Sequence, residues 1–138
     1  SPCGAHLTSS LLLGFALFLT FVTRLGAAPL QIGDKLDDFA LTNLNGSAIT
    51  ASDLPYDRAL LIIFSSIVCP SSLKYDIHRT QIHNQYDPKG VRLISVNANF
   101  NEKNEAIQNH YTRHPLPFTI YRDPDNQLAD LLGATQLQ

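Results

Sequence analysis

The sequence predicts an α/β domain in which helices cover a largely parallel sheet. Two apolar runs, Ala59 to Phe64 and Val91 to Val96, have the length and the Leu, Ile and Val content of strands that are buried on both faces. A segment of helical length follows each run, and a third short strand is expected at residues 118–121. Strands that alternate with helices through short loops form right-handed crossovers and a parallel core.

Residues 38–50 predict a small antiparallel pair ahead of this core. The dipeptide Asn45-Gly46 lies between two short alternating segments, where it is the strongest short-range signal for a β-hairpin. The run Ala59 to Phe64 is expected in the middle of the sheet, because an unbroken apolar strand needs cover on both faces.

Three helices are expected between and after the parallel strands. The first begins at Cys69-Pro70, since proline is favoured at a first helical position, and residues 87–90 end it. The second covers residues 101–114, and a last short helix covers residues 125–132. The side chains predicted to face inward from the first two helices are Leu73, Tyr75, Ile77, Ile82 and Tyr86, and then Ala106, Ile107 and Tyr111.

Residues 1–28 are expected to be a signal peptide. Leu11 to Val22 is an almost wholly apolar run, and the small residues Gly26-Ala-Ala28 after it are typical of a cleavage site. A membrane span needs about 20 apolar residues, so an uncleaved anchor is the weaker alternative. With no initiating Met, the start is expected to be truncated. Residues 29–138 are then an exported domain, periplasmic or extracellular.

The charge balance excludes some classes of partner. The sequence has 10 Lys and Arg against 12 Asp and Glu, and removal of the signal peptide takes away only Arg24. This balance predicts no basic face for nucleic acid, and the dispersed charges predict no membrane-binding patch. No Gly-rich phosphate loop is present, and no cofactor is expected.

Cys69 is the candidate reactive residue. The other cysteine, Cys3, lies in the expected signal peptide, so the mature domain would hold no internal disulfide. Cys69 is predicted at a strand end where a helix begins. There the helix dipole, the N–H groups of Ser71 and Ser72 and the Ser72 hydroxyl would stabilise a thiolate and bring the thiol pKa near or below neutrality. The alternative is a buried apolar cysteine.

A metal site is the weaker interpretation of the histidines. His110 and His114 are four residues apart and would share one face of a helix, and Cys69 with a histidine could bind copper. No further ligands are patterned for a site around these residues or around His78 and His83. Solvated helix residues are the simpler interpretation, and no metal is expected.

Three segments carry a resemblance to a known family: Ala59 to Tyr75, Tyr86 to Asn99 and Pro117 to Thr135. Together they resemble the redoxin group of the thioredoxin-like superfamily. This group holds the alkyl hydroperoxide reductase and thiol-specific antioxidant (AhpC/TSA) relatives, which include exported TlpA-like proteins. The resemblance implies a thioredoxin-like three-layer α/β/α sandwich with Cys69 as its reactive residue. Because the family continues with a Thr-Pro, two strands and a helix, it also implies a domain that is truncated at its C-terminus.

The resemblance also separates the candidate activities. Dithiol relatives have a second cysteine where Ser72 stands, and peroxiredoxins have a Pro-x-x-x-Thr/Ser-x-x-Cys signature in which Ser66 matches the hydroxyl but Ile62 replaces the proline. The leading hypothesis is an antioxidant-type thiol oxidoreductase that reacts through Cys69 alone, by a mixed disulfide or a sulfenic acid. Ser72 and Ser66 complete the expected site, a thiol, disulfide or peroxide is the substrate, and an external thiol is the reductant. The alternatives are a non-catalytic binding module and a one-Cys peroxidase.

Overall fold

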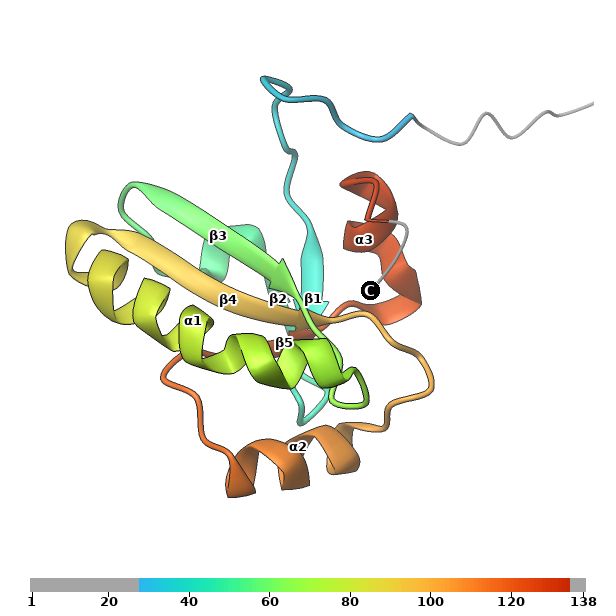
Figure 1. The fold of residues 1–138 in the computed structure, drawn as a ribbon. Helices are drawn as coiled ribbons and strands as arrows, with labels where there is room; N and C mark the ends of the chain where they lie inside the picture. Colours follow the sequence, from blue (N-terminus) through green and yellow to red (C-terminus); the bar gives the residue numbers. More distant parts are fainter. Residues whose placement is uncertain (1–27, 135–138) are drawn as a thin grey trace, which may run out of the picture.

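A five-stranded mixed sheet forms the frame of the domain (Figure 1). The computed structural model describes residues 28–134, so the expected signal peptide, apart from Ala28, lies outside the described residues. The strands are β1 (Ala40–Thr42), β2 (Ala48–Thr50), β3 (Ala59–Phe64), β4 (Val91–Asn97) and β5 (Ile120–Arg122). They lie in the order β2-β1-β5-β4-β3, in which β3, β4 and β5 are parallel and β1 is antiparallel to both its neighbours.

The predicted hairpin is confirmed in β1 and β2. Residues 43–47 form its turn, in which the Gly46 N–H donates to the Asn43 carbonyl at 2.9 Å. Gly46 has a φ of 87°, a conformation that glycine adopts without steric cost.

The predicted place of β3 in the middle of the sheet is wrong within the described residues. β3 pairs only with β4 and forms one edge, while β4 has a partner on each side. Residues 60–64 of β3 are half-buried, whereas residues 93–97 of β4 are fully buried. An apolar run indicates that the side chains of a strand are covered on both faces of the sheet. It does not indicate whether the strand has a neighbouring strand on each side.

The helices are α1 (Pro70–Tyr86), α2 (Asn104–Arg113) and α3 (Gln127–Leu131), with single helical turns at η1 (Ala51–Asp53), η2 (Asp87–Lys89) and η3 (Pro124–Asn126). α1 begins at the predicted proline, and α2 begins three residues later than predicted, at a cap formed by Lys103. None of the helices within residues 28–134 combines the length and the apolar character that a bilayer crossing requires.

β4 separates two apolar cores and so creates the three layers. Its Leu93 packs with Ile107 of α2 and with Phe118 and Ile120 on one face of the sheet. On the opposite face, Ile94 and Val96 pack in a second cluster, whose buried members are Phe39, Leu41, Leu54 and Leu128. α1 and α2 therefore cover one face and α3 contributes to the other (Figure 1). The predicted α/β sandwich is confirmed.

The face that α1 turns toward the sheet differs in part from the predicted one: Ile82 packs inward as predicted, but other members of the set are exposed. Tyr75 and Ile77 are 60% and 69% exposed, and the buried residue of the helix is Arg79, which is 4% exposed. Its guanidinium donates to the Ser72 carbonyl at 3.0 Å and the Ser95 hydroxyl at 3.3 Å, and it also pairs with the Asp76 carboxylate. These partners compensate the buried charge, although the Arg79 Nε has no partner among the described residues. The sheet side of α1 therefore carries Arg79 beside the apolar Ile82. In α2, Ile107 and Tyr111 point inward as predicted, but Ala106 is exposed.

Gly90 forms the corner between α1 and β4. Its φ is 84°, and a Cβ atom added there would lie 3.1 Å from the Cβ atom of Asp57. Its carbonyl accepts a hydrogen bond from the Arg58 N–H at 2.9 Å, directly beside the first pair of the β3–β4 ladder, Ala59 with Val91. Glycine at this corner therefore allows the two strands to start in register.

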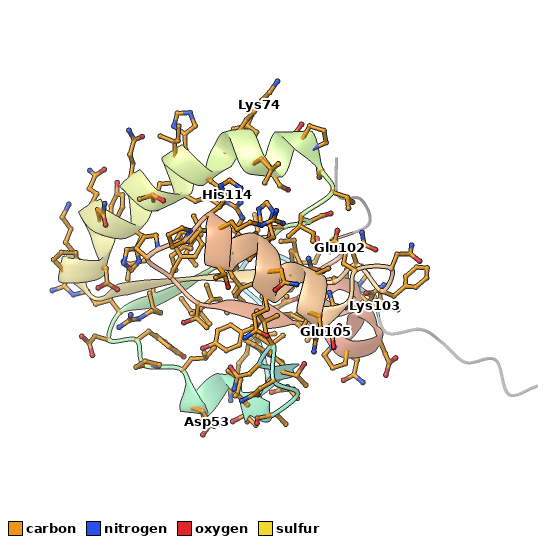
Figure 2. The ribbon with its side chains drawn as sticks, turned by 90° about the horizontal axis from the view of Figure 1, so that it is seen from below. Asp53, Lys74, Glu102, Lys103, Glu105 and His114 are labelled. Atoms are coloured by element: carbon orange, nitrogen blue, oxygen red, sulfur yellow. The ribbon has the colours of Figure 1, made fainter. Side chains whose placement is uncertain are left out.

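We expect replacement of Arg79 by alanine to destabilise the domain by about 2–3 kcal/mol, because it leaves buried acceptors without their charged donor. Denaturant unfolding followed by circular dichroism measures the change. The matched control is Lys74→Ala, on the outward side of the same helix (Figure 2), which should change stability little. An equal effect of both substitutions would contradict a structural role for Arg79.

Candidate functional site

Cys69 lies where the loop after β3 meets α1. It is the N-cap residue of the helix, with an extended backbone (φ −85°, ψ 113°), and Pro70 occupies the first helical position. Proline suits this position because the N–H that it lacks would have no partner inside the helix. Cys69 is half-buried, so it is not an apolar residue of the core. Its sulfur lies close to the N–H groups of the first helical turn, which have no carbonyl partner inside the helix.

Hydrogen bonds from that first turn hold the pKa of the Cys69 thiol below its ordinary value. The strongest influence is the Ser72 N–H, which outweighs the partial burial that opposes ionisation; the Ser71 N–H and the two serine hydroxyls add to it. All these groups donate to the sulfur, and donors favour the anion over the thiol. The direction of the shift is the one expected from the sequence.

Ser66 and Ser72, the two other predicted site residues, are in contact. The Ser66 N–H donates to the Ser72 hydroxyl oxygen at 3.3 Å, and the Ser66 hydroxyl oxygen accepts a hydrogen bond from the Val68 N–H at 3.3 Å. Ser66 is buried, and its own hydroxyl proton is donated to the carboxylate of Glu102. Ser72 thus contacts the Cys69 sulfur directly, whereas Ser66 contacts Ser72.

Glu102 is a site residue that the sequence reasoning missed. It lies in the loop between β4 and α2, where Figure 2 shows it near the start of the helix, and it is only 4% exposed. Its carboxylate accepts hydrogen bonds from Ser66, Ile67, Asn97 and Asn99. A signal was present, because a polar run follows β4 at the edge of the sheet where ligands gather.

The predicted histidine pair lies at the end of α2. His110 and His114, at the end of α2, have ring centroids 5.0 Å apart, and burial together with the charge of His114 lowers the pKa of His110. Within residues 28–134, no three side chains of the metal-binding types gather into a group that could hold a metal ion.

Two exposed apolar side chains flank Cys69 in the sequence. Val68 immediately precedes it and is 69% exposed, and Leu73 lies one turn into α1. From Leu73 a groove of about 510 Å³ extends between α1 and the end of α2, where Ile77, Leu116 and His114 line it. Leu73, in the first turn of α1 after Cys69, therefore joins the surface near the thiol to a groove whose lining is partly apolar and partly polar.

The comparisons with known proteins agree with this architecture. The thiol-disulfide oxidoreductase ResA of Halalkalibacterium halodurans is 27% identical over 128 residues, which cover 93% of this chain and 70% of that protein. A solved structure assigned as the thiol:disulfide interchange protein DsbE of Chlorobium tepidum is 27% identical, with a TM-score of 0.62, over 78% of this chain and 74% of that one.

A second solved structure is similar over a smaller share of its length. It is an uncharacterised conserved protein of Geobacillus kaustophilus, 26% identical with a TM-score of 0.66, of which the match covers 58%, against 75% of this chain. The model of the AhpC/TSA family matches residues 32–138, which include Cys69, Ser66, Ser72 and Glu102. The chain therefore belongs to the AhpC/TSA family.

Proposed function

We propose that this protein is a thiol-disulfide oxidoreductase that reacts through Cys69. The observation that carries the proposal is the set of donors from Ser71 and Ser72 that stabilise the Cys69 thiolate at the start of α1. A thiolate is the nucleophile in thiol-disulfide exchange, and a depressed pKa makes it available at neutral pH. The names of the similar ResA and DsbE proteins support the same reaction class.

The reaction is a series of three exchanges. The Cys69 thiolate attacks one sulfur of a substrate disulfide, forms a mixed disulfide and releases the other sulfur as a thiolate, which takes up a proton. The thiolate of an external thiol then attacks the Cys69 sulfur of the mixed disulfide and releases the substrate with both of its sulfurs reduced. Another external thiolate attacks the external sulfur now bonded to Cys69 and frees the Cys69 thiolate, so that one substrate disulfide is reduced and two external thiols are oxidised to a disulfide.

The second thiolate has to come from another molecule. Ser72 stands one helical turn after Cys69, where dithiol relatives have a cysteine, and a hydroxyl cannot displace a disulfide-bonded partner. The serine instead donates to the sulfur. The proposal therefore includes an external thiol as reductant.

The surroundings of Cys69 favour a disulfide carried by a polypeptide. Val68 and Leu73 expose apolar surface on both sides of the residue in sequence, and the groove beside α1 continues this surface. An extended organic substrate can cover such surface, whereas a small peroxide gains nothing from it.

The position of Ser66 disfavours a peroxidase. A peroxidase of the one-Cys type would use this hydroxyl beside the thiol, but Ser66 donates its proton to Glu102. Hydrogen bonds from Ser71 and Ser72 act on the sulfur instead.

The proposed reaction takes place outside the cytoplasm. The apolar run and the small residues within residues 1–28 support export. Thiol exchange fits that compartment, since disulfides persist in oxidising surroundings.

We expect alkylation of Cys69 by iodoacetamide to rise with pH through a midpoint below that of the same thiol in the denatured chain, because hydrogen bonds in the folded chain favour the thiolate. Mass spectrometry of the Cys69 peptide measures the rate at each pH. Ser72→Ala should move the midpoint upward only in part, because the Ser72 N–H remains. Equal midpoints for the folded and denatured chains would contradict the proposal.

We expect the wild type to accumulate a one-to-one adduct at Cys69 when it is mixed with an excess of a disulfide such as insulin or oxidised glutathione. Ser72→Cys should release the adduct by closing a bridge to Cys69, so that turnover with insulin and a thiol reductant rises. Cys69→Ala should be inert.

The matched control for this experiment is Ser71→Cys. Residues two apart on a helix do not face each other, so a thiol at position 71 should resolve the adduct at Cys69 less efficiently than a thiol at position 72. Intact mass and turnover of all four proteins give the result. If the wild type forms no adduct and Ser72→Cys is folded but inert, Cys69 is not a redox thiol and the chain is a binding module.

A further inference from the structure

Glu102 is a buried carboxylate that none of the exchange steps uses. Burial alone would raise its pKa, but hydrogen bonds from the Ser66 hydroxyl, the Ile67 N–H and the Asn97 amide together hold its pKa below the ordinary value. It is therefore ionised at neutral pH while 4% exposed. A buried anion is costly unless donors surround it, and here it has a full set.

The four donors come from two separate segments of the chain. Oε1 accepts from the Ser66 hydroxyl and from the Asn99 amide at 2.9 Å. Oε2 accepts from the Ile67 N–H at 3.0 Å and from the Asn97 amide at 2.6 Å. Since a carboxylate offers about four acceptor sites, all are occupied, and the group ties the loop before Cys69 to the end of β4.

The side of β4 that faces Glu102 is itself fixed. The Asn97 side-chain oxygen accepts from the Asn99 N–H at 3.0 Å and from the Arg122 guanidinium at 2.5 Å. The amide nitrogen of Asn97 must therefore point at Glu102. The carboxylate is bound to the end of β4, a buried strand with a partner on each side, and it also binds the loop before Cys69.

That loop leads directly to the thiol. Ser66, held by Glu102, donates its N–H to the Ser72 hydroxyl oxygen at 3.3 Å, which leaves the Ser72 proton available to the sulfur of Cys69. The chain of contacts runs from Glu102 through Ser66 and Ser72 to the thiol, and each link depends on the one before it.

We propose that Glu102 is a positioning residue for the Cys69 thiolate, which acts by locking Ser66 and Ile67 so that Ser72 stays oriented as a donor to the sulfur. The inference rests on the proposed function of Cys69 as a nucleophile. The direction in which the Cys69 pKa changes distinguishes a positioning role of Glu102 from a purely electrostatic one. Loss of the Glu102 hydrogen bonds to Ser66 and Ile67 should raise the pKa of the Cys69 thiol. Loss of a nearby anion that acts only through its charge should instead lower the thiol pKa.

The test is the pH profile of Cys69 alkylation in the full chain for Glu102→Gln. Glutamine keeps the shape of the side chain, but its NH₂ group is a donor and would face two of the donors that bind the carboxylate, so those hydrogen bonds would be lost. We expect the alkylation rate at neutral pH to fall about three- to tenfold, with an unchanged plateau at high pH. Glu105→Gln removes the same charge three residues along, at an exposed site near the start of α2 (Figure 2), and should leave the profile unchanged.

Ser66→Ala gives a second measurement if Glu102→Gln does not fold. It removes one contact to Glu102 and keeps the Ser66 N–H, so the rate should fall in the same direction by a smaller factor. A midpoint that is unchanged or lower in the folded Glu102 variant, or unchanged in Ser66→Ala, overturns the inference. Because the inference concerns the difference between variant and wild type, a failure of the wild type to form adducts is a separate result that bears on the proposed function.

Discussion

The parallel pairing of β3 with β4 is the constraint on which the rest of the structure depends. Six residue pairs, from Ala59 with Val91 to Phe64 with Val96, bring both strands to an end at the same edge of the sheet. The ladder continues one step further, because the Ser65 N–H donates to the Val96 carbonyl at 2.9 Å and the hydroxyls of Ser65 and Ser95 lie 2.6 Å apart. The loops that carry Cys69 and Glu102 therefore emerge side by side.

Two buried charges of opposite sign act on the segment between Ser66 and Ser72. Arg79, from the second half of α1, binds the Ser72 carbonyl, and Glu102, from the loop before α2, binds Ser66 and Ile67. Each binds several partners, which is the condition under which a protein interior tolerates a charge. The thiol lies at the end of a loop that is held by polar contacts, while the two apolar cores lie on the two faces of the sheet.

The features that could be predicted from the sequence are those set by neighbouring residues. The apolar runs, the Asn45-Gly46 turn and the Cys69-Pro70 helix start depend on local propensity, and the structure has each of them.

The features that could not be predicted depend on contacts between distant residues. The buried position of Arg79 requires Ser95 from β4, and the role of Glu102 requires Ser66, which is 36 positions away. From the neighbouring sequence alone, the polar side chains of Arg79 and Glu102 would be predicted on the solvent-exposed surface. Only the meeting of β3 and β4 turns them inward, and the edge position of β3 is likewise a property of the whole sheet.

Gly90 shows how far from the chemistry a decisive position can lie. It stands at the opposite end of β4 from the reactive edge, about 20 Å away by the length of the strand. A side chain there would press on Asp57 and disturb the corner that sets the register. A slip of one residue would turn every β4 side chain to the other face, so that Asn97 would leave Glu102 and Ser95 would leave Arg79. A substitution at this corner should therefore disturb the reactive edge, although the corner itself carries no reactive group.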